Sequence, residues 1–429
     1  MAYERPRSFL WACLFASGLS ASACAPSSRE DASPTPSASA PPAASSGPTA
    51  EDEPGPFTGR RAARKLRRRL VAQTLATSDD ELRLRRARTA FAAVPEGDES
   101  ELALLEGLDV MLRAPPRSAT YERTTVTLLA ASRWLARGEP ARARALLDPR
   151  RNLAAGRDPA EREMLVDLLF RLEGREAAVA RGTEPDGSER VLVVARAEAR
   201  YGDFRRATAV ARATDDLYAC RIWNALVVRH VRDGREPDAA LAIERARRAS
   251  EPAGKLAGAS LECLVDFARA ASAVGAADEV SRVFAQLPTD YVWPACRVLD
   301  ALATGFDPIR LDVVVDVVAL PRDPLQDPSP NCYFDASVAA SRAGRRDLGR
   351  SLRARGARRA KGFELVYLGS SRPHLVAFAL GEVDPFVSPE PKPFQAEDVV
   401  LLGVLLDERP DAVFDASAFE RAFPPTLDP

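Results

Sequence analysis

The chain has 429 residues and nearly balanced charge, with 60 lysines and arginines against 61 aspartates and glutamates. This balance argues against a general binder of nucleic acid, which needs a basic surface. Hydrophobic residues make up 46% of the chain, so it can bury a substantial core, and its length suits one long domain or two ordinary ones.

The first 23 residues have the pattern of a bacterial export signal. Arg5 and Arg7 precede an apolar run from Phe9 to Ala16, and the small residues Ala21-Ser22-Ala23 follow it. The run is too short for a transmembrane helix, which needs about 20 apolar residues. We therefore predict a signal peptide over residues 1–23 and a protein exported from the cytoplasm.

Cys24 would be the first residue after cleavage of this signal. Small residues before a cysteine resemble the lipobox of bacterial lipoproteins, although Ala21 stands where that family prefers leucine. The resemblance implies a diacylglyceryl group on the Cys24 thiol and anchoring in the bacterial cell envelope, at the periplasmic face of the outer membrane. The alternative is an ordinary A-x-A cleavage site, which would give a soluble secreted or periplasmic protein.

Residues 24–56 are rich in proline, serine and alanine and contain no aromatic side chain. Such a segment cannot bury enough apolar surface to offset its ordering entropy. We predict a disordered tether that would hold a folded body away from a membrane, or else an ordinary disordered N-terminus.

A cluster of cations follows the tether, and on a helix it would surround an apolar seam of Ala63, Leu66 and Leu70. One interpretation is a surface for anionic lipid headgroups or an envelope polysaccharide. The other is a solvated first helix that caps the fold. The cations are Arg60, Arg61, Arg64, Lys65, Arg67, Arg68 and Arg69.

Beyond residue 57 the chain is rich in alanine, leucine, arginine and glutamate, and apolar residues recur three and four positions apart. This pattern predicts an all-α body over residues 57–360. Ser78-Asp79-Asp80-Glu81 has the spacing of a capping box, with Ser78 as the predicted N-cap.

Glycines divide this body into units of 28 to 41 residues, and an alanine follows several of them five positions later, as in Gly138 and Ala143. A left-handed glycine can end one helix while the alanine lets the next helix pack closely. Here the chain resembles the tetratricopeptide-repeat (TPR) family over residues 118–356. The resemblance implies a right-handed α-solenoid of helix–turn–helix repeats that binds a protein partner. The glycines are Gly138, Gly174, Gly202, Gly234, Gly275, Gly305 and Gly344.

An internal duplication supports a stacked array. The segment 220–226 matches 296–302, and the segment 263–275 matches 332–344. The order of the matched segments indicates a duplicated pair of helical hairpins.

Four cysteines begin the first helices of these hairpins: Cys220, Cys263, Cys296 and Cys332. In an oxidising compartment they could form disulfides, and the duplication favours Cys220 with Cys263 and Cys296 with Cys332. Alternatively they are small buried core residues. The spacing of cysteines and histidines does not indicate a zinc site.

The sequence contains no catalytic or cofactor-binding motif that we recognise, and we expect no cofactor and no resident metal. His230 is expected to lie near a helix end, and His374 has no predicted role. Residues 361–429 depart from the repeat and contain the proline-rich segment 389–393. We expect them to form a partly irregular, partly helical cap over the last repeat.

These features favour an envelope lipoprotein that acts as a protein-interaction scaffold, with an unknown protein partner and a membrane attachment through Cys24. An envelope lipoprotein that binds carbohydrate or another small ligand is the alternative. An enzyme with an unrecognised site is a third interpretation.

Overall fold

The protein is described here by a computed structural model. The structure describes residues 55–114, 121–148, 159–181, 187–214, 216–250, 330–342, 344–360, 372–387 and 396–423, together with residue 394 and some residues between 263 and 279. The predicted signal peptide, Cys24, most of the tether, Cys296 and the proline-rich segment 389–393 lie outside the described residues.

The all-α prediction is confirmed for the described residues, which form helices joined by turns, with one isolated β-bridge between Thr58 and Val413. The helices before the largest gap are α2 (Gly59–Ala76), α3 (Asp80–Ala93), α4 (Glu99–Arg113), α5 (Tyr121–Ala136), α6 (Pro140–Leu146), α7 (Pro159–Glu173), α8 (Arg175–Arg181), α9 (Gly187–Tyr201), α10 (Phe204–Ala213), α11 (Asp216–Arg232) and α12 (Glu236–Ser250). Those after it are α16 (Pro330–Arg342), α17 (Arg346–Ala360), α19 (Arg372–Ala379), α20 (Ala396–Asp407) and α21 (Ala416–Ala422).

Glycines separate the helices of successive antiparallel pairs, as the sequence predicts. The predicted left-handed conformation is present at Gly138, Gly174, Gly234, Gly275 and Gly344. The prediction of a left-handed conformation is wrong for Gly202, where a Cβ atom would lie 2.6 Å from the Phe170 ring. Gly202 therefore permits a close approach between helices and does not provide a left-handed turn. Ala143, five residues after Gly138, is fully buried in its pair.

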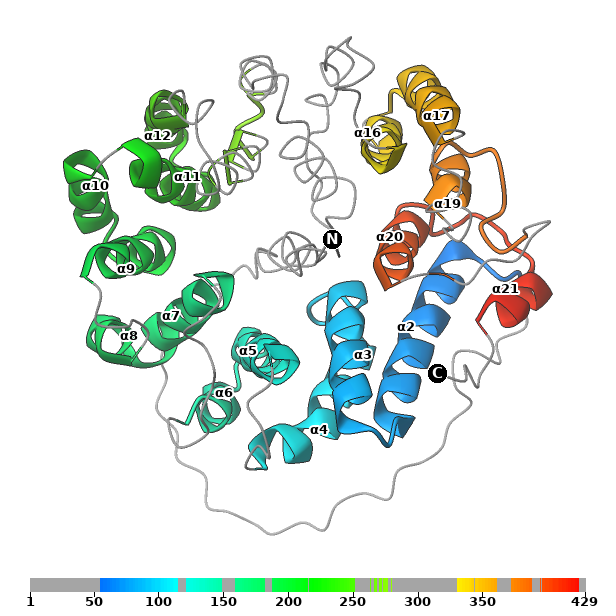
Figure 1. Ribbon diagram of the computed structural model, residues 1–429, viewed down its shortest axis with the longest axis horizontal. Helices are drawn as coiled ribbons and strands as arrows, with labels where there is room; N and C mark the ends of the chain where they lie inside the picture. Colours follow the sequence, from blue (N-terminus) through cyan, green and yellow to red (C-terminus); the bar gives the residue numbers. More distant parts are fainter. Residues whose placement is uncertain are drawn as a thin grey trace, which may run out of the picture.

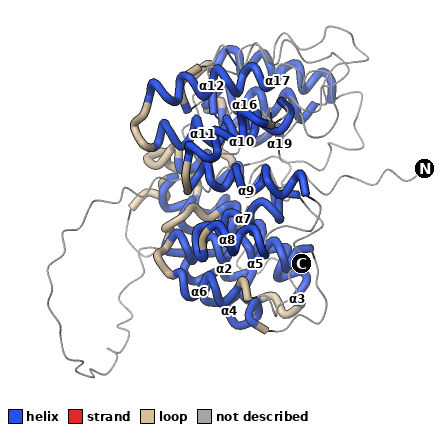
Figure 2. The backbone as a smooth tube through the Cα atoms, turned by 90° about the vertical axis from the view of Figure 1, so that its left-hand side faces the viewer, coloured by secondary structure: helices blue, strands red, loops and turns tan. Residues whose placement is uncertain are grey.

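The described helices follow one another around a ring (Figure 1). Successive contacts run from α5 to α7, α9 and α11, and each of these helices packs against an outer partner, α6, α8, α10 or α12. Seen from the side, the blue helices extend from α4 and α6 at one end of the molecule to α12 and α17 at the other (Figure 2). Between the two layers apolar side chains are buried, among them the fully enclosed Leu128, Leu146 and Trp134.

The C-terminal segment joins the two ends of the described fold. It was expected to cover the last repeat; α20 does pack on α19, but it also packs on α2 and α3. The backbone N–H of Gly59 donates to Ala412 at 2.8 Å, and that of Phe414 donates to Phe57 at 2.9 Å. Residues 396–423 are therefore part of the same packed body as the first helix.

The start of α3 lies one residue later than the capping-box prediction. Asp79 is the N-cap, and its carboxylate accepts a hydrogen bond from the backbone N–H of Leu82 at 2.6 Å. Aspartate and serine cap helices equally well, so adjacent Ser78 and Asp79 offered two equivalent starts.

Candidate functional site: a disulfide beside a buried charge cluster

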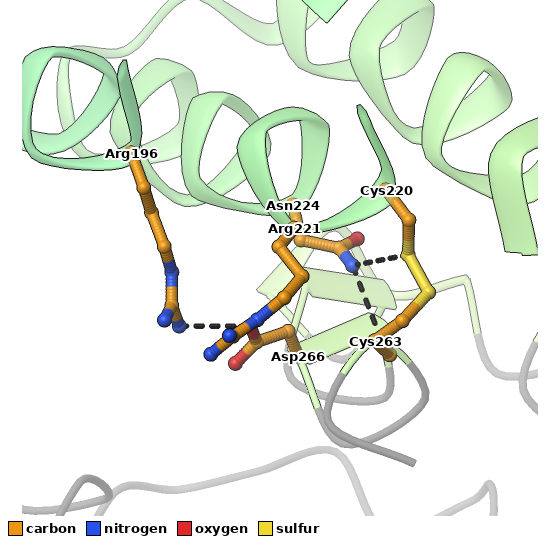
Figure 3. The surroundings of a disulfide bond; sticks show 6 residues. All are labelled: Arg196, Cys220, Arg221, Asn224, Cys263 and Asp266. Atoms are coloured by element: carbon orange, nitrogen blue, oxygen red, sulfur yellow. Dashed lines mark hydrogen bonds and ion pairs between the residues drawn. A yellow bond between two sulfur atoms is a disulfide. The ribbon is translucent and has the colours of Figure 1, made fainter. Parts of the chain in front are cut away.

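A disulfide joins Cys220 in α11 to Cys263, with the two Cα atoms 5.9 Å apart (Figure 3). Both cysteines are buried. This is the pairing that the duplicated sequence favoured, and it links residues 43 positions apart. The bond therefore fixes α11 against the segment that contains Cys263.

Asn224 lies one turn after Cys220 and reinforces this junction. Its amide nitrogen lies 3.3 Å from the Cys220 sulfur and donates to the backbone carbonyl of Cys263, also at 3.3 Å (Figure 3). The side chain is buried, so these contacts replace hydrogen bonds that the amide nitrogen would make to water. The junction thus combines a covalent bond with a buried hydrogen bond.

A buried charge cluster lies beside the disulfide. Asp266, three residues after Cys263, contacts Arg196 of α9 at 2.8 Å and Arg221 of α11 at 3.2 Å. Glu163 of α7 contacts both arginines, with 2.5 Å to Arg221. Figure 3 shows Arg196 and Arg221 converging on Asp266 from neighbouring helices. Two guanidinium groups thus face two carboxylates, and α7, α9 and α11 meet at one neutral cluster.

The electrostatics of the cluster keep Glu163 ionised. Burial raises the pKa of the Glu163 carboxyl, but the nearby guanidinium groups of Arg196 and Arg221 outweigh burial and hold its pKa below the ordinary value. Burial, followed by the charges of Arg200 and Arg221, lowers the pKa of Arg196. A carboxylate with a lowered pKa and two guanidinium partners is a weak proton acceptor. The arrangement is suited to holding helices together.

The duplicated counterpart of this junction lies near α16. Cys332 is buried and disulfide-bonded, and Asp335 follows it by three residues, as Asp266 follows Cys263. Asp335 contacts Arg372 of α19 at 3.0 Å. The predicted partner of Cys332, Cys296, lies outside the described residues. In both matched segments the aspartate three residues after the cysteine therefore binds an arginine from a neighbouring helix.

Acidic residues from other segments compensate most of the α2 cations. Its seam residues Ala63 and Leu66 are buried against the core. Arg60 is exposed, and its side chain has no ion pair with a described residue; Arg61 donates to the backbone carbonyl of Gly55 at 2.9 Å. The remaining ion pairs are Arg64 with Glu99 at 3.6 Å, Lys65 with Glu420 at 2.6 Å, Arg67 with Asp98 at 3.1 Å and with Asp407, Arg68 with Glu99 at 2.8 Å, and Arg69 with Glu420. These contacts leave α2 fewer cations for an external anion and join the helix to the last described helices of the chain.

Neither histidine takes part in the ion pairs of the charge cluster. His230 is buried in the last turn of α11, near the helix end where the sequence placed it, and its ring packs edge-on against Phe204. The Nε2 atom of His374 lies 3.1 Å from the backbone oxygen of Asp384. Each histidine therefore has a structural contact in its own part of the fold.

The described residues contain no group of three histidine, cysteine, aspartate or glutamate side chains placed to hold a metal ion. Among the same residues, no helix is both long and apolar enough to cross a membrane.

Sequence reasoning missed the charge cluster and the ion pairs between α2 and the last described helices. A signal for the cluster was present, because Cys263 and Asp266 recur as Cys332 and Asp335 in the matched segments. The partners of these aspartates come from other helices at irregular separations, which periodicity does not reveal.

Comparison with known proteins gave no match to any family model, any curated protein or any solved structure.

Proposed function

We propose that this chain is an exported bacterial lipoprotein whose TPR-like α-solenoid serves as a protein-interaction scaffold in the cell envelope. The observation that supports it most directly is the buried Cys220–Cys263 disulfide within an array of helical pairs. Structural disulfides persist mainly in oxidising compartments outside the cytoplasm. The export pattern before Cys24 independently predicts the same compartment.

The helical pairs support the scaffold part of the proposal. Stacked helical pairs present extended surfaces for partners, and the buried charges of Glu163 and Arg196 are held in ion pairs within the fold. Large apolar side chains are exposed at Val110 of α4 and Leu241 of α12, with exposed fractions of 80% and 55%. These positions are suitable for detecting a partner because a substitution there does not disturb the core.

The anchor is tested by metabolic labelling with a radiolabelled fatty acid in a bacterium that processes lipoproteins. We expect label on the wild-type chain and none on Cys24→Ser. Equal labelling of both chains would contradict lipidation at Cys24. Fractionation of cells that express Cys24→Ser then shows whether this variant is exported without a lipid or is not exported.

The scaffold function is tested by placing a photo-crosslinking amino acid at Leu241 or Val110 in the exported chain. We expect irradiation of intact cells to give a discrete adduct with one envelope protein from at least one position. Placement at the fully buried Leu128 is the control for indiscriminate crosslinking. The scaffold proposal fails if adducts from the exposed positions match those from Leu128.

A further inference from the structure

The outer helix α17 has the composition of a basic surface. It carries six arginines and one acidic residue, Asp347, although the whole chain has a net charge of −1. Its buried side contains Leu352 and the close-packed Gly349 and Gly356, which face α16 and α19. Arg346, Arg350 and Arg358 are exposed on the remaining, outward side, and α17 itself lies at the rim of the ring in Figure 1.

Only part of this charge is neutralised within the described residues. Arg350 pairs with Asp347 at 2.8 Å and with Glu382 at 3.3 Å, and Arg353 also pairs with Glu382. Arg345, immediately before the helix, and Arg346, Arg355 and Arg358 within it make no ion pair with a described residue. In α2, by contrast, Arg64, Lys65, Arg67, Arg68 and Arg69 all have carboxylate partners.

The arrangement of these arginines suits an extended anionic plane. They are distributed along a helix of 15 residues, or about 22 Å, and do not converge on a pocket. The exposed residues between them, Ser351, Ala354 and Ala357, are small. Long arginine side chains can therefore reach past them to a flat surface, and guanidinium groups bind phosphate oxygens in a bidentate manner.

We propose that the outward face of α17 is a docking surface for the anionic phosphate headgroups of a phospholipid membrane. The helix has no aromatic side chain, whereas surfaces for single-stranded nucleic acid combine cations with aromatic stacking platforms. Its two leucines, Leu348 and Leu352, pack on the core, so it would lie on the headgroups without inserting a large apolar side chain. This contact does not require a lipid on Cys24.

The test is co-sedimentation of the full chain with vesicles of phosphatidylcholine, alone or mixed with phosphatidylglycerol. Two variants are compared: Arg346→Gln with Arg358→Gln in α17, and Arg205→Gln with Arg212→Gln in α10. All four arginines are exposed and make no ion pair within the described part of the chain. Both variants lose the same charge, and α10 lies on a different part of the ring (Figure 1). All chains share one N-terminus, and binding to phosphatidylcholine alone is subtracted.

We expect the α17 variant to bind mixed vesicles about 25-fold more weakly, since each of the two lost cations near an anionic membrane contributes about a factor of five. The α10 variant should lose less than about twofold, and added salt should weaken wild-type binding. Thermal unfolding verifies that both variants fold. Equal binding by the wild type and the α17 variant overturns the proposal, as does an equal loss in both variants. The proposal is also overturned if the α17 variant loses binding to duplex DNA or an acidic polysaccharide but binds the mixed vesicles as well as the wild type does.

Discussion

The ammonium nitrogen of Lys65 lies 2.6 Å from a carboxylate oxygen of Glu420, so the first described helix is paired with the last. Arg69 binds the same carboxylate and also donates to the backbone oxygen of Phe423. Phe57 and Phe419 pack edge to face beside them, with ring centroids 5.2 Å apart. Charge and apolar contacts thus act together where the first and last described helices meet.

Replacing Glu420 by glutamine should weaken this junction in a pH-dependent way. Burial raises the pKa of Glu420, but hydrogen bonds from Lys65 and Arg69 outweigh it and lower the pKa below 4.5. Because the pKa is lower in the folded chain than in the unfolded chain, the Glu420 contacts stabilise the fold at pH values above the pKa of the unfolded chain. This stabilisation is lost as the pH falls through the pKa of the folded chain. Because the carboxylate is 40% exposed, solvent screening limits the effect to about 0.5–1 kcal/mol. Urea unfolding at pH 7 and at pH 3 measures it: a deficit that is no larger at pH 7 would contradict the expectation.

Gly59→Ala tests whether backbone contact holds the ends together. A Cβ atom on Gly59 would lie 2.0 Å from the backbone oxygen of Arg409, and a carbonyl at this position cannot move as a flexible side chain can. We expect a loss of about 1–3 kcal/mol by overpacking and faster amide hydrogen exchange in α2 and α21. Gly403→Ala in α20 is the matched control, since its Cβ would lie 3.7 Å from the nearest atom, the Ala93 oxygen. A comparable loss in the control would disprove the steric explanation.

Removing the Cys220–Cys263 disulfide by a double serine substitution should destabilise the fold. Closing a loop across 43 residues is worth about 4 kcal/mol in the chain-entropy model, and native-state relaxation reduces this to about 2–4 kcal/mol. Denaturant unfolding of both chains measures the difference. A reducing agent should lower the stability of the wild type by more than that of the double variant. Equal responses to the reducing agent would show that this bond contributes nothing.

Glu163→Gln should be among the most damaging single substitutions in the charge cluster. It leaves Arg196 and Arg221 with one shared carboxylate, and breaking a buried ion pair typically costs about 3–5 kcal/mol. Glu244→Gln is a matched control, because Glu244 also binds two arginines but on the exposed surface of α12. There solvent screening should leave the free energy of unfolding almost unchanged. Similar losses in both variants would contradict the role assigned to burial.

His230 should cause a second pH dependence of stability. It comes from a buried imidazole that is kept neutral, whereas that of Glu420 comes from a carboxylate that is kept ionised. Burial lowers its pKa, and the charge of Arg235 lowers it further; Asp238 and Asp233 act against this shift and Arg229 adds to it. The unfolded chain therefore takes up a proton near pH 6.5 while the folded chain stays neutral, so stability should fall as the pH drops below about 6.5. His230→Gln should flatten this slope in thermal unfolding between pH 7 and pH 5. An unchanged slope in the variant would rule out His230 as the source of this pH dependence.

Local features of this fold could be predicted from sequence, and distant contacts could not. Gly138 and Gly234 adopt the predicted left-handed turns because a glycine with flanking helical periods is a local signal. The favoured Cys220–Cys263 pairing came from the internal duplication. The contacts of Lys65 with Glu420 and of Asp266 with Arg196 depend on where distant helices pass one another, and no repeat or spacing encodes this.

The contact of α20 with α2 also bears on how the molecule would unfold. In a linear array of repeats the terminal units contact one neighbour and fray first. Here α2 and α20 each stabilise the other, so the ends of the described chain have a neighbour on both sides. Weakening either end should loosen both, and amide exchange in α2 and α20 should then rise together, as a single cooperative unit.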